Sequence, residues 1–225
     1  MTSMSPPASA AAPAAAPAAV RRPRSRRGEG DRLRPDIIAA ATRLLLETGD
    51  ADSVSIRSIA DAVGVSSPAI YLHFPDKAAL LYAVCEEQFQ ELDRVIEGAV
   101  TGATDPGDAL RRRARAYLRF GLEHPEQYRI LFMCRADELH AHTADETVKE
   151  SSAFQHLVDS IDDAITAGLF PAGDAERIAV DLWVCVHGVT SLRIAVPNFP
   201  WPDDPDTMLD RVLAAYCTGL TATTG

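Results

Sequence analysis

The side chains best suited to contact a partner molecule are the small ones at Ser66, Ser67 and Ala69. A helix enters the major groove of DNA only where its leading side chains are small enough to let it approach the base edges. Ser66 is a good N-cap and Pro68 is tolerated in a first turn, so a short helix is expected to begin here. Pro75 ends it. The expected helix is therefore suited to contact bases.

Longer polar side chains follow on the same stretch of sequence. Tyr71 and His73 have polar tips that can reach phosphate oxygens, and such contacts position a protein on DNA without reading its sequence. Lys77 stands at the start of the next expected helix, where its charge and the exposed backbone amides favour a phosphate. Contacts to the DNA backbone are thus expected beside the contacts to bases.

A second short helix is expected just before this segment, over residues 55–64. Its apolar positions recur with helical spacing, at Ile56, Ile59, Ala60 and Val63. Ser55 is a good N-cap, and Gly64 allows a tight turn into the following helix. Ile70 is expected to turn inward and pack on the first helix. Two short helices joined by a glycine turn form a helix-turn-helix, here at about residues 55–74.

The rest of the chain is also helical in pattern, and no stretch alternates convincingly as a strand. Further helices are expected over 34–48, 77–97, 108–123, 125–133, 147–169, 174–195 and 205–220. The segment 174–195 is apolar on nearly every side, so it is expected to be buried on two sides. The fold class is therefore all-α.

Residues 42–84 resemble the DNA-binding domain of the tetracycline-repressor (TetR) family. The signature pieces are SIRSIADAVGVS at 55–66, IYLHF at 70–74 and DKAALL at 76–81. The resemblance spans about residues 34–94. It implies a homodimeric all-α repressor, with an N-terminal three-helix DNA-binding domain followed by a helical ligand-binding and dimerisation domain.

The resemblance also assigns roles to individual residues. It implies phosphate contacts for Ser55, Tyr71, His73 and Lys77, base contacts for Ser66, Ser67 and Ala69, and a backbone or base contact for Arg57. This chain departs from the family at SSPAI, where many members have a Lys-Gly-Thr-like stretch after the serine. Fewer direct hydrogen bonds to bases are expected, with more specificity from thymine methyl groups and DNA shape.

The C-terminal half carries a weaker motif, WVCVHG at residues 183–188, which resembles the Trp-x-x-x-His-Gly class of TetR-type C-terminal domains. Trp183 and His187 are four residues apart and share one helix face. Together with Tyr117, Phe120 and Phe132 they are candidates to line a pocket for a small hydrophobic effector. Ordinary core packing, with a hydrogen-bonded histidine, is the alternative interpretation of the same residues.

Charge divides the chain unevenly. Residues 1–77 hold ten Lys and Arg against eight Asp and Glu, whereas residues 78–225 hold twelve against twenty-four. The asymmetry indicates an N-terminal part that meets a polyanion. Residues 1–30 form an Ala/Pro-rich tail, in which the segment 5–19 has no large apolar side chain and is expected to be disordered. The arginine cluster between Arg21 and Arg27 is either a DNA-contacting arm or part of a solubilising tail.

Several other classes of protein are not expected. The four cysteines form no C-x-x-C pair, and no run approaches the ~18 apolar residues of a membrane helix. No G-x-S-x-G, P-loop, G-x-G-x-x-G or H-E-x-x-H motif is present, so neither an enzyme nor a cofactor is expected. His140 and His142 near Cys134 fit no standard metal spacing, so no metal site is expected either. A reduced, cytoplasmic protein is expected.

These observations lead to one main expectation and two alternatives. The main one is a ligand-responsive repressor that binds a palindromic double-stranded DNA operator as a homodimer. Its expected parts are the tail at 1–30, the DNA-binding domain at 31–94, and an effector-binding domain at 95–225 that dimerises through 174–195 and 205–220. The first alternative is a DNA-binding regulator without an effector, which is constitutive, activating or gated by a partner. The remote alternative is an all-α enzyme.

Overall fold

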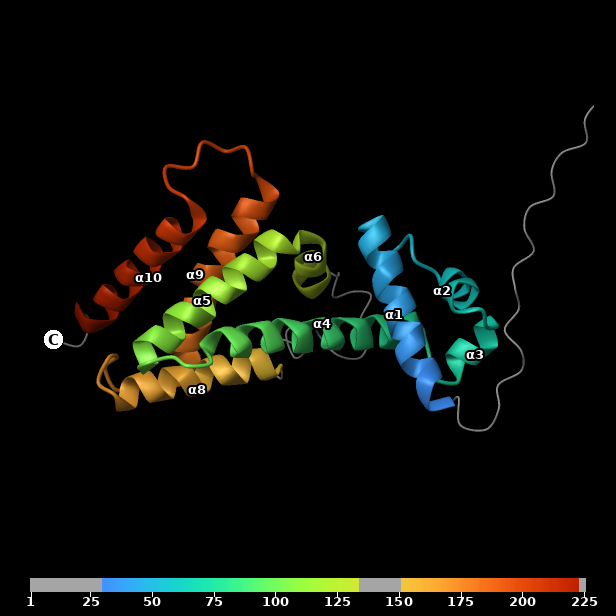
Figure 1. Cartoon of the computed structure of the whole chain (residues 1–225), viewed down its shortest axis with the longest axis horizontal. Coiled ribbons are helices and arrows are strands. Elements are labelled where there is room, and N and C mark those ends of the chain that lie inside the picture. Colours follow the sequence, from blue (N-terminus) through green and yellow to red (C-terminus); the bar gives the residue numbers. More distant parts are fainter. Residues whose placement is uncertain (1–29, 134–150, 223–225) are drawn as a thin grey trace, which may run out of the picture.

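The computed structural model describes residues 30–133 and 151–222, and within these ranges it is helical and contains no strand (Figure 1). The helices are α1 (Gly30–Thr48), α2 (Ile56–Val63), α3 (Ser67–Tyr71), α4 (Lys77–Val100), α5 (Pro106–Glu123), α6 (Pro125–Met133), α8 (Ser152–Thr166), α9 (Ala175–Ala195) and α10 (Pro205–Ala222). The all-α prediction is confirmed. The arginines between Arg21 and Arg27, and the group Cys134, His140 and His142, lie outside the described residues.

Helices α1, α2 and α3 pack with the start of α4 around one apolar core, at the blue and cyan end of the molecule in Figure 1. Ile37, Ile59, Ile70 and Leu80 are fully buried in it. Ile70 therefore turns inward as predicted. Helix α1 begins at Gly30, four residues earlier than expected, and contains Pro35.

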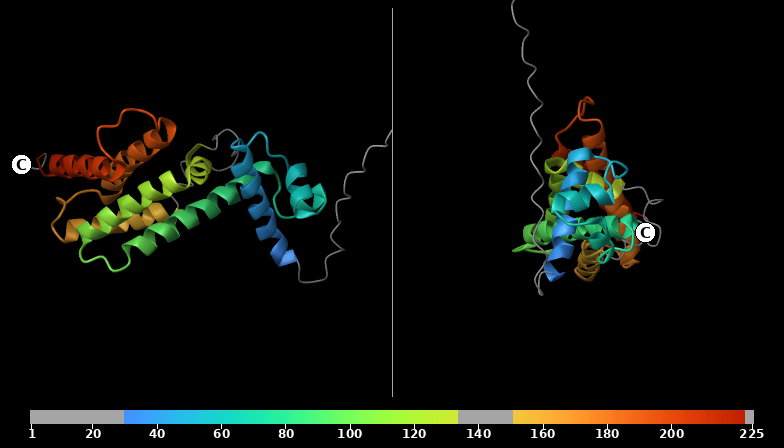
Figure 2. Two further views of the ribbon diagram at one scale, coloured as in Figure 1. Left: turned by 45° about the horizontal axis from the view of Figure 1, so that its top comes forward. Right: turned by 90° about the vertical axis from the view of Figure 1, so that its right-hand side faces the viewer.

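The C-terminal part consists of the rest of α4 with α5, α8, α9 and α10, which lie side by side (Figures 1 and 2). Two helices, α4 and α6, contribute side chains to both the N-terminal core and the next core. On α4, Leu80 to Cys85 belong to the N-terminal core, whereas Phe89, Leu92 and Ile96 belong to the next core. The change of core falls between Cys85 and Phe89, so the long helix α4 is shared by both domains rather than ending one of them.

Helix α9 is long and apolar enough to cross a membrane by length and composition alone, with a mean hydropathy of 1.4. The core helix of a soluble protein passes the same test, and α9 packs against α5, α8 and α10. Its buried side is lined by residues such as Ile178, Leu182 and Val189. The expectation of burial on two sides is wrong for the single chain, because Val184 on another face is 59% exposed.

Helices α5 and α9 approach each other closely at Gly121. A Cβ atom at this position would lie 2.3 Å from Cγ2 of the buried Thr190 on α9, and 3.0 Å from the ring of Tyr128. Neither neighbour is the loose end of an exposed side chain. The absence of a side chain at Gly121 therefore sets the spacing of the two helices.

We expect Gly121→Ala to lower the free energy of unfolding by roughly 1–3 kcal/mol, because the added methyl group overpacks this contact. Gly98 on α4 is the matched control, since a Cβ atom there meets nothing within 4 Å. In a helix the Gly98→Ala change is expected to raise stability by up to ~1 kcal/mol. Urea denaturation followed by circular dichroism measures both, and equal stability of the two variants would contradict the packing described.

Candidate functional site

The helix-turn-helix is built by local hydrogen bonds around α2. The Ser55 hydroxyl accepts from the Ser58 backbone N–H at 3.0 Å, and the Ser58 hydroxyl accepts from the Ser55 N–H at 3.0 Å. Gly64 ends the helix with φ of 78°, a left-handed conformation that favours glycine. Ser55 thus has a structural role as a cap, and its predicted phosphate contact would add to that role.

Helix α3 presents the predicted base-contacting residues and is shorter than expected. It covers Ser67–Tyr71, and the segment to Phe74 continues as a turn in which the His73 and Phe74 N–H groups both donate to the carbonyl of Ile70. Ser66 occupies the N-cap position and is exposed, but its side chain makes no capping hydrogen bond. Ser67 and Ala69 are half-buried. The base contacts of these residues stay predictions.

Two large side chains project from the end of α3. Tyr71 is 52% exposed and Leu72 is 85% exposed, while the neighbouring Ile70 is fully buried. Sequence reasoning named Tyr71 but missed Leu72. A leucine two residues after a buried isoleucine on so short a helix cannot also face the core. This spacing could have predicted from the sequence that Leu72 is exposed. Arg57, on α2, is exposed as well, and His73 is half-buried.

The Lys77 side chain, expected to contact a phosphate, makes a hydrogen bond within the protein. Its Nζ donates to the carbonyl oxygen of Ala51 at 2.6 Å, which ties the loop before α2 to the start of α4. Asp76 caps α4, with its carboxylate accepting from the Ala79 N–H at 2.7 Å. A carboxylate therefore already occupies the helix end where a phosphate was expected. An ammonium has three N–H donors, so a phosphate contact by Lys77 stays a prediction.

The C-terminal part encloses a cavity of about 290 Å³. Its wall comes from six helices and is mainly apolar, with Phe89, Phe132, Phe154, Leu157, Leu182 and Leu213 among the residues that line it. The polar groups at its wall include the side chains of Arg111, Arg113 and Ser151. A cavity of this kind suits a small apolar compound.

The predicted effector residues divide into two groups. Tyr117, Phe132 and Trp183 line the cavity, but Phe120 and His187 are not part of its wall. Phe120 is buried, and its ring lies beside that of His124 in a tilted arrangement, with the ring centroids 5.4 Å apart. Phe120 therefore lies outside this cavity, because that face of α5 turns away from it, and its contact with an effector stays a prediction.

His187 belongs to a hydrogen-bonded group behind the cavity wall. Its Nδ1 lies 2.7 Å from the Tyr128 hydroxyl and 3.0 Å from the Tyr117 hydroxyl, and the Trp183 indole N–H donates to Tyr117 at 3.3 Å. Burial lowers the pKa of His187 and raises the pKa values of both tyrosines. The lowered pKa favours the neutral histidine, whose Nδ1 has one lone pair and can accept from the nearer hydroxyl, that of Tyr128. This matches the alternative interpretation, a histidine hydrogen-bonded within the core.

Helix α5 carries a run of arginines, Arg111, Arg112, Arg113 and Arg115, and three of them form ion pairs with acidic side chains. Arg112 pairs with Asp108 at 2.9 Å, Arg113 with Glu97 at 2.6 Å and Arg115 with Asp210 at 2.6 Å. The first pair lies within α5, and the other two join α5 to α4 and α10. Arg113 and Arg115 therefore contribute to helix packing, whereas Arg111 lines the cavity.

The lowered pKa of His187 makes stability depend on pH. The unfolded chain takes up the proton more readily, so stability is full above the ordinary value of 6.5 and falls as the pH drops below it. We expect His187→Gln to reduce the difference in Tm between about pH 7.5 and about pH 5.5. Exposed His124 provides the control variant, His124→Gln. A Tm difference in His187→Gln as large as that of the unchanged chain would refute this assignment.

Comparisons with known families cover both parts of the chain. Residues 37–84 match the family described as bacterial regulatory proteins, tetR family. Residues 110–216 match the tetracyclin repressor-like C-terminal domain. The two matches fall on the helix-turn-helix and on the domain that contains the cavity.

Individual relatives agree with this assignment. The chain is 28% identical to the HTH-type transcriptional regulator EthR of Mycolicibacterium smegmatis, over 76% of this chain and 74% of that protein. It is 32% identical to the HTH-type transcriptional activator FasR of the same species, over 45% of this chain and 46% of that one. A solved structure from Rhodococcus sp. RHA1, of unknown function, is 30% identical with a TM-score of 0.68 and covers 84% of this chain and 95% of its own.

The two family matches together span more than half of the chain, and the named relatives are transcriptional regulators. The chain therefore belongs to the tetracycline-repressor family of DNA-binding transcriptional regulators.

Proposed function

We propose that this regulator is a ligand-responsive repressor that binds a palindromic DNA operator as a homodimer in the cytoplasm. The observation that carries the proposal is the apolar cavity of about 290 Å³ in the C-terminal domain. One wall of that cavity is formed by α6, a helix that also packs into the core of the DNA-binding domain.

Helix α6 supplies the connection between effector and DNA. Phe132 lines the cavity, and Ile130 on the same helix is buried in the N-terminal core. The Cys85 thiol on α4 donates to the carbonyl of Ile130 at 3.6 Å. A ligand that displaces Phe132 would therefore move a helix on which the DNA-binding domain rests. The ligand needs only a different affinity for the two arrangements, and a coupling of ~1–3 kcal/mol changes affinity several-fold or more.

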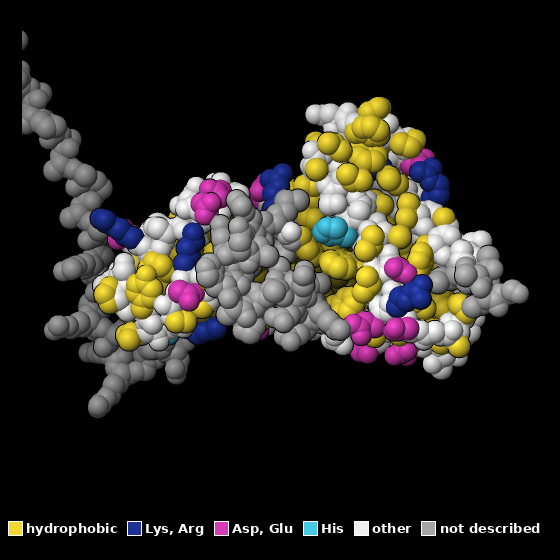
Figure 3. Space-filling view, turned by 180° about the vertical axis from the view of Figure 1, so that it is seen from behind, with side chains coloured by type: hydrophobic (Ala, Val, Ile, Leu, Met, Phe, Trp, Pro, Cys, Tyr) yellow, Lys and Arg dark blue, Asp and Glu magenta, His cyan; other side chains and the backbone are white. Residues whose placement is uncertain are grey.

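The exposed apolar face of α9 supports dimerisation. Val180, Val184 and Leu192 are exposed on a helix whose other side is buried, and Figure 3 shows hydrophobic side chains gathered over the C-terminal helices. A second copy of α9, with α10 beside it, would cover this face. Two recognition helices would then meet successive major grooves, about 34 Å apart, on a palindromic site.

The effector is proposed to be a small hydrophobic compound, because the cavity wall is mainly apolar. Trp183 is the member of the Trp-x-x-x-His-Gly motif that lines the cavity, and His187 supports it from behind through Tyr117. Membership of the Trp-His-Gly class stays a prediction. A relative named as an activator leaves activation as the second candidate for the sign of regulation.

We expect tight, saturable binding to DNA from upstream of this protein's own gene, measured by fluorescence anisotropy at two salt concentrations. Tyr71→Ala should weaken it by about 1.5 kcal/mol, roughly tenfold, because a phosphate loses its hydrogen bond to the hydroxyl.

Two arginines give a matched control for this experiment. Arg57→Ala, on α2, should weaken binding. It should also make the slope of log affinity against log salt concentration shallower by about 1, the effect of one lost phosphate contact. Arg94 is also exposed but lies on the C-terminal half of α4, so Arg94→Ala should change neither quantity. Binding that is insensitive to Tyr71 and Arg57 would remove α2 and α3 from the DNA interface.

The cavity can be tested with the fluorescence of Trp183. In a Trp201→Phe background this is the remaining tryptophan of the chain, and medium-chain fatty acids and phenols can be screened against it. We expect saturable changes in emission that Ala114→Leu abolishes by filling the cavity. Ala109→Leu, on the same helix but outside the cavity wall, should leave them intact. An Ala114→Leu variant that binds as well as the Ala109→Leu control would place the compound elsewhere.

A further inference from the structure

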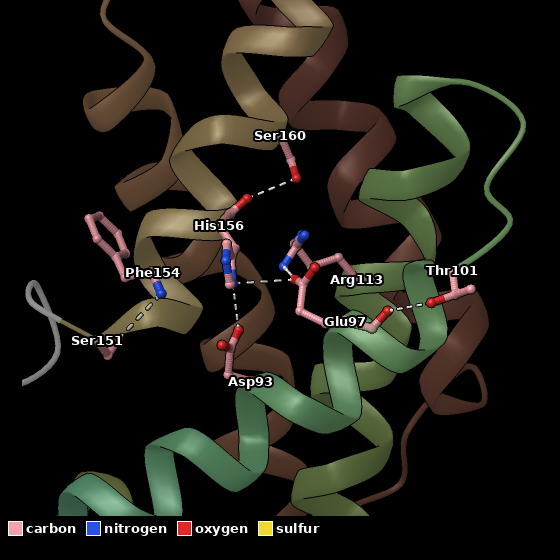
Figure 4. Close-up of polar contacts among 8 residues, drawn as sticks. All are labelled: Asp93, Glu97, Thr101, Arg113, Ser151, Phe154, His156 and Ser160. Atoms are coloured by element: carbon pink, nitrogen blue, oxygen red, sulfur yellow. Dashed lines mark hydrogen bonds and ion pairs between the residues drawn. The ribbon is translucent and has the colours of Figure 1, made fainter.

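Three side chains that can bind a metal ion meet between α4 and α8 (Figure 4). They are Asp93 and Glu97, four residues apart on one face of α4, and His156 on the second turn of α8. One ligand atom from each lies within 4.8 Å of the others. We propose that this group, the 93–97–156 cluster, binds one divalent transition-metal cation and so joins α8 to the C-terminal half of α4.

The distances within the cluster suit a shared ion. His156 Nδ1 lies 2.9 Å from Asp93 Oδ1 and 3.6 Å from Glu97 Oε1. Ligand atoms bound at about 2.0–2.2 Å to one Zn²⁺ ion stand roughly 3–3.5 Å from each other. Only small adjustments of side chains would therefore place all three atoms around an ion. The His156 Nδ1 would give up its hydrogen bond to Asp93 and bind as a neutral imidazole.

Charge favours a cation at this position over an anionic compound. Within the described residues, the guanidinium that pairs with these carboxylates is that of Arg113, which donates to Glu97 at 2.6 Å. With a neutral histidine the group retains one negative charge. The Asp93 side chain is only 13% exposed, which strengthens its attraction for a cation compared with a surface carboxylate. His156 and Glu97 are more exposed and leave a path for the ion to enter.

Arg113 would orient one of the metal-binding carboxylates, that of Glu97, by a hydrogen bond. Carboxylates that bind metals are themselves hydrogen-bonded, and such partners orient them. A carboxylate has two oxygens, so Glu97 can keep the bond to Arg113 with one and bind the ion with the other. The buried guanidinium of Arg113 fixes the Glu97 side chain at the mouth of the cluster.

The ligand set indicates the class of cation. One imidazole with two carboxylates suits Zn²⁺, Mn²⁺, Fe²⁺ or Ni²⁺, whereas Mg²⁺ and Ca²⁺ prefer oxygen ligands alone. Three protein ligands leave further coordination positions to water. The proposal does not depend on the cavity or on its effector, because none of the three ligands lines the cavity.

Equilibrium dialysis of the metal-free full chain against Zn²⁺ tests the proposal. We expect one saturable equivalent per chain, and a Kd raised about tenfold or more by His156→Gln and by Asp93→Asn. Asp162→Asn removes an exposed carboxylate from α8 and serves as the matched control, with an unchanged Kd. A His140→Ala/His142→Ala variant should also bind normally. Absence of saturable binding, or loss of binding in that double variant alone, would overturn the assignment.

A second measurement needs no variant. X-ray absorption of the zinc-loaded, unmodified chain should show nitrogen and oxygen ligands that include a single imidazole and no sulfur. Zinc should also raise the Tm, because it binds the folded arrangement of α4 and α8. A spectrum with two imidazoles or with sulfur would place the ion at other histidines or at the cysteines and would refute the 93–97–156 cluster.

Discussion

Helix α6 imposes the constraint on which the rest of the structure depends, because its side chains belong to two cores at once. Ile130 is buried among the helices of the DNA-binding domain, whereas Tyr128 and Leu131 are buried in the C-terminal domain. Close packing leaves little room for a helix in this position to move independently of either side. We therefore propose that a change in the wall of the cavity, at Phe132, is transmitted to the N-terminal core through Ile130.

The sequence was most informative where local chemistry decides the structure. Ser55, Gly64 and Ile70 each follow simple rules for caps, turns and buried faces, and the structure places them accordingly. The cavity could not be assigned in the same way, because it depends on which faces of six helices meet. Periodicity marks an apolar face but does not distinguish Phe120, which turns away, from Tyr117, which lines the cavity.

Polar contacts between residues far apart along the chain could not be predicted from the sequence either. Lys77 bonds to Ala51, and His187 lies between Tyr117 and Tyr128, across large separations along the chain. The cluster of Asp93, Glu97 and His156 arises in the same manner, since α4 and α8 are brought together by packing. By contrast, the all-round apolar character of residues 174–195 was visible in the sequence, and the exposed Val184 is the part of that pattern on which the proposed dimer contact rests.

The central claim is that the cavity and the DNA-binding face are coupled through α6. The direct measurement is the affinity for operator DNA with and without a saturating concentration of the compound that changes Trp183 emission most. The account predicts that the compound weakens DNA binding by about fivefold or more, and that DNA weakens binding of the compound by the same factor. An operator affinity that stays the same when the cavity is saturated would contradict it.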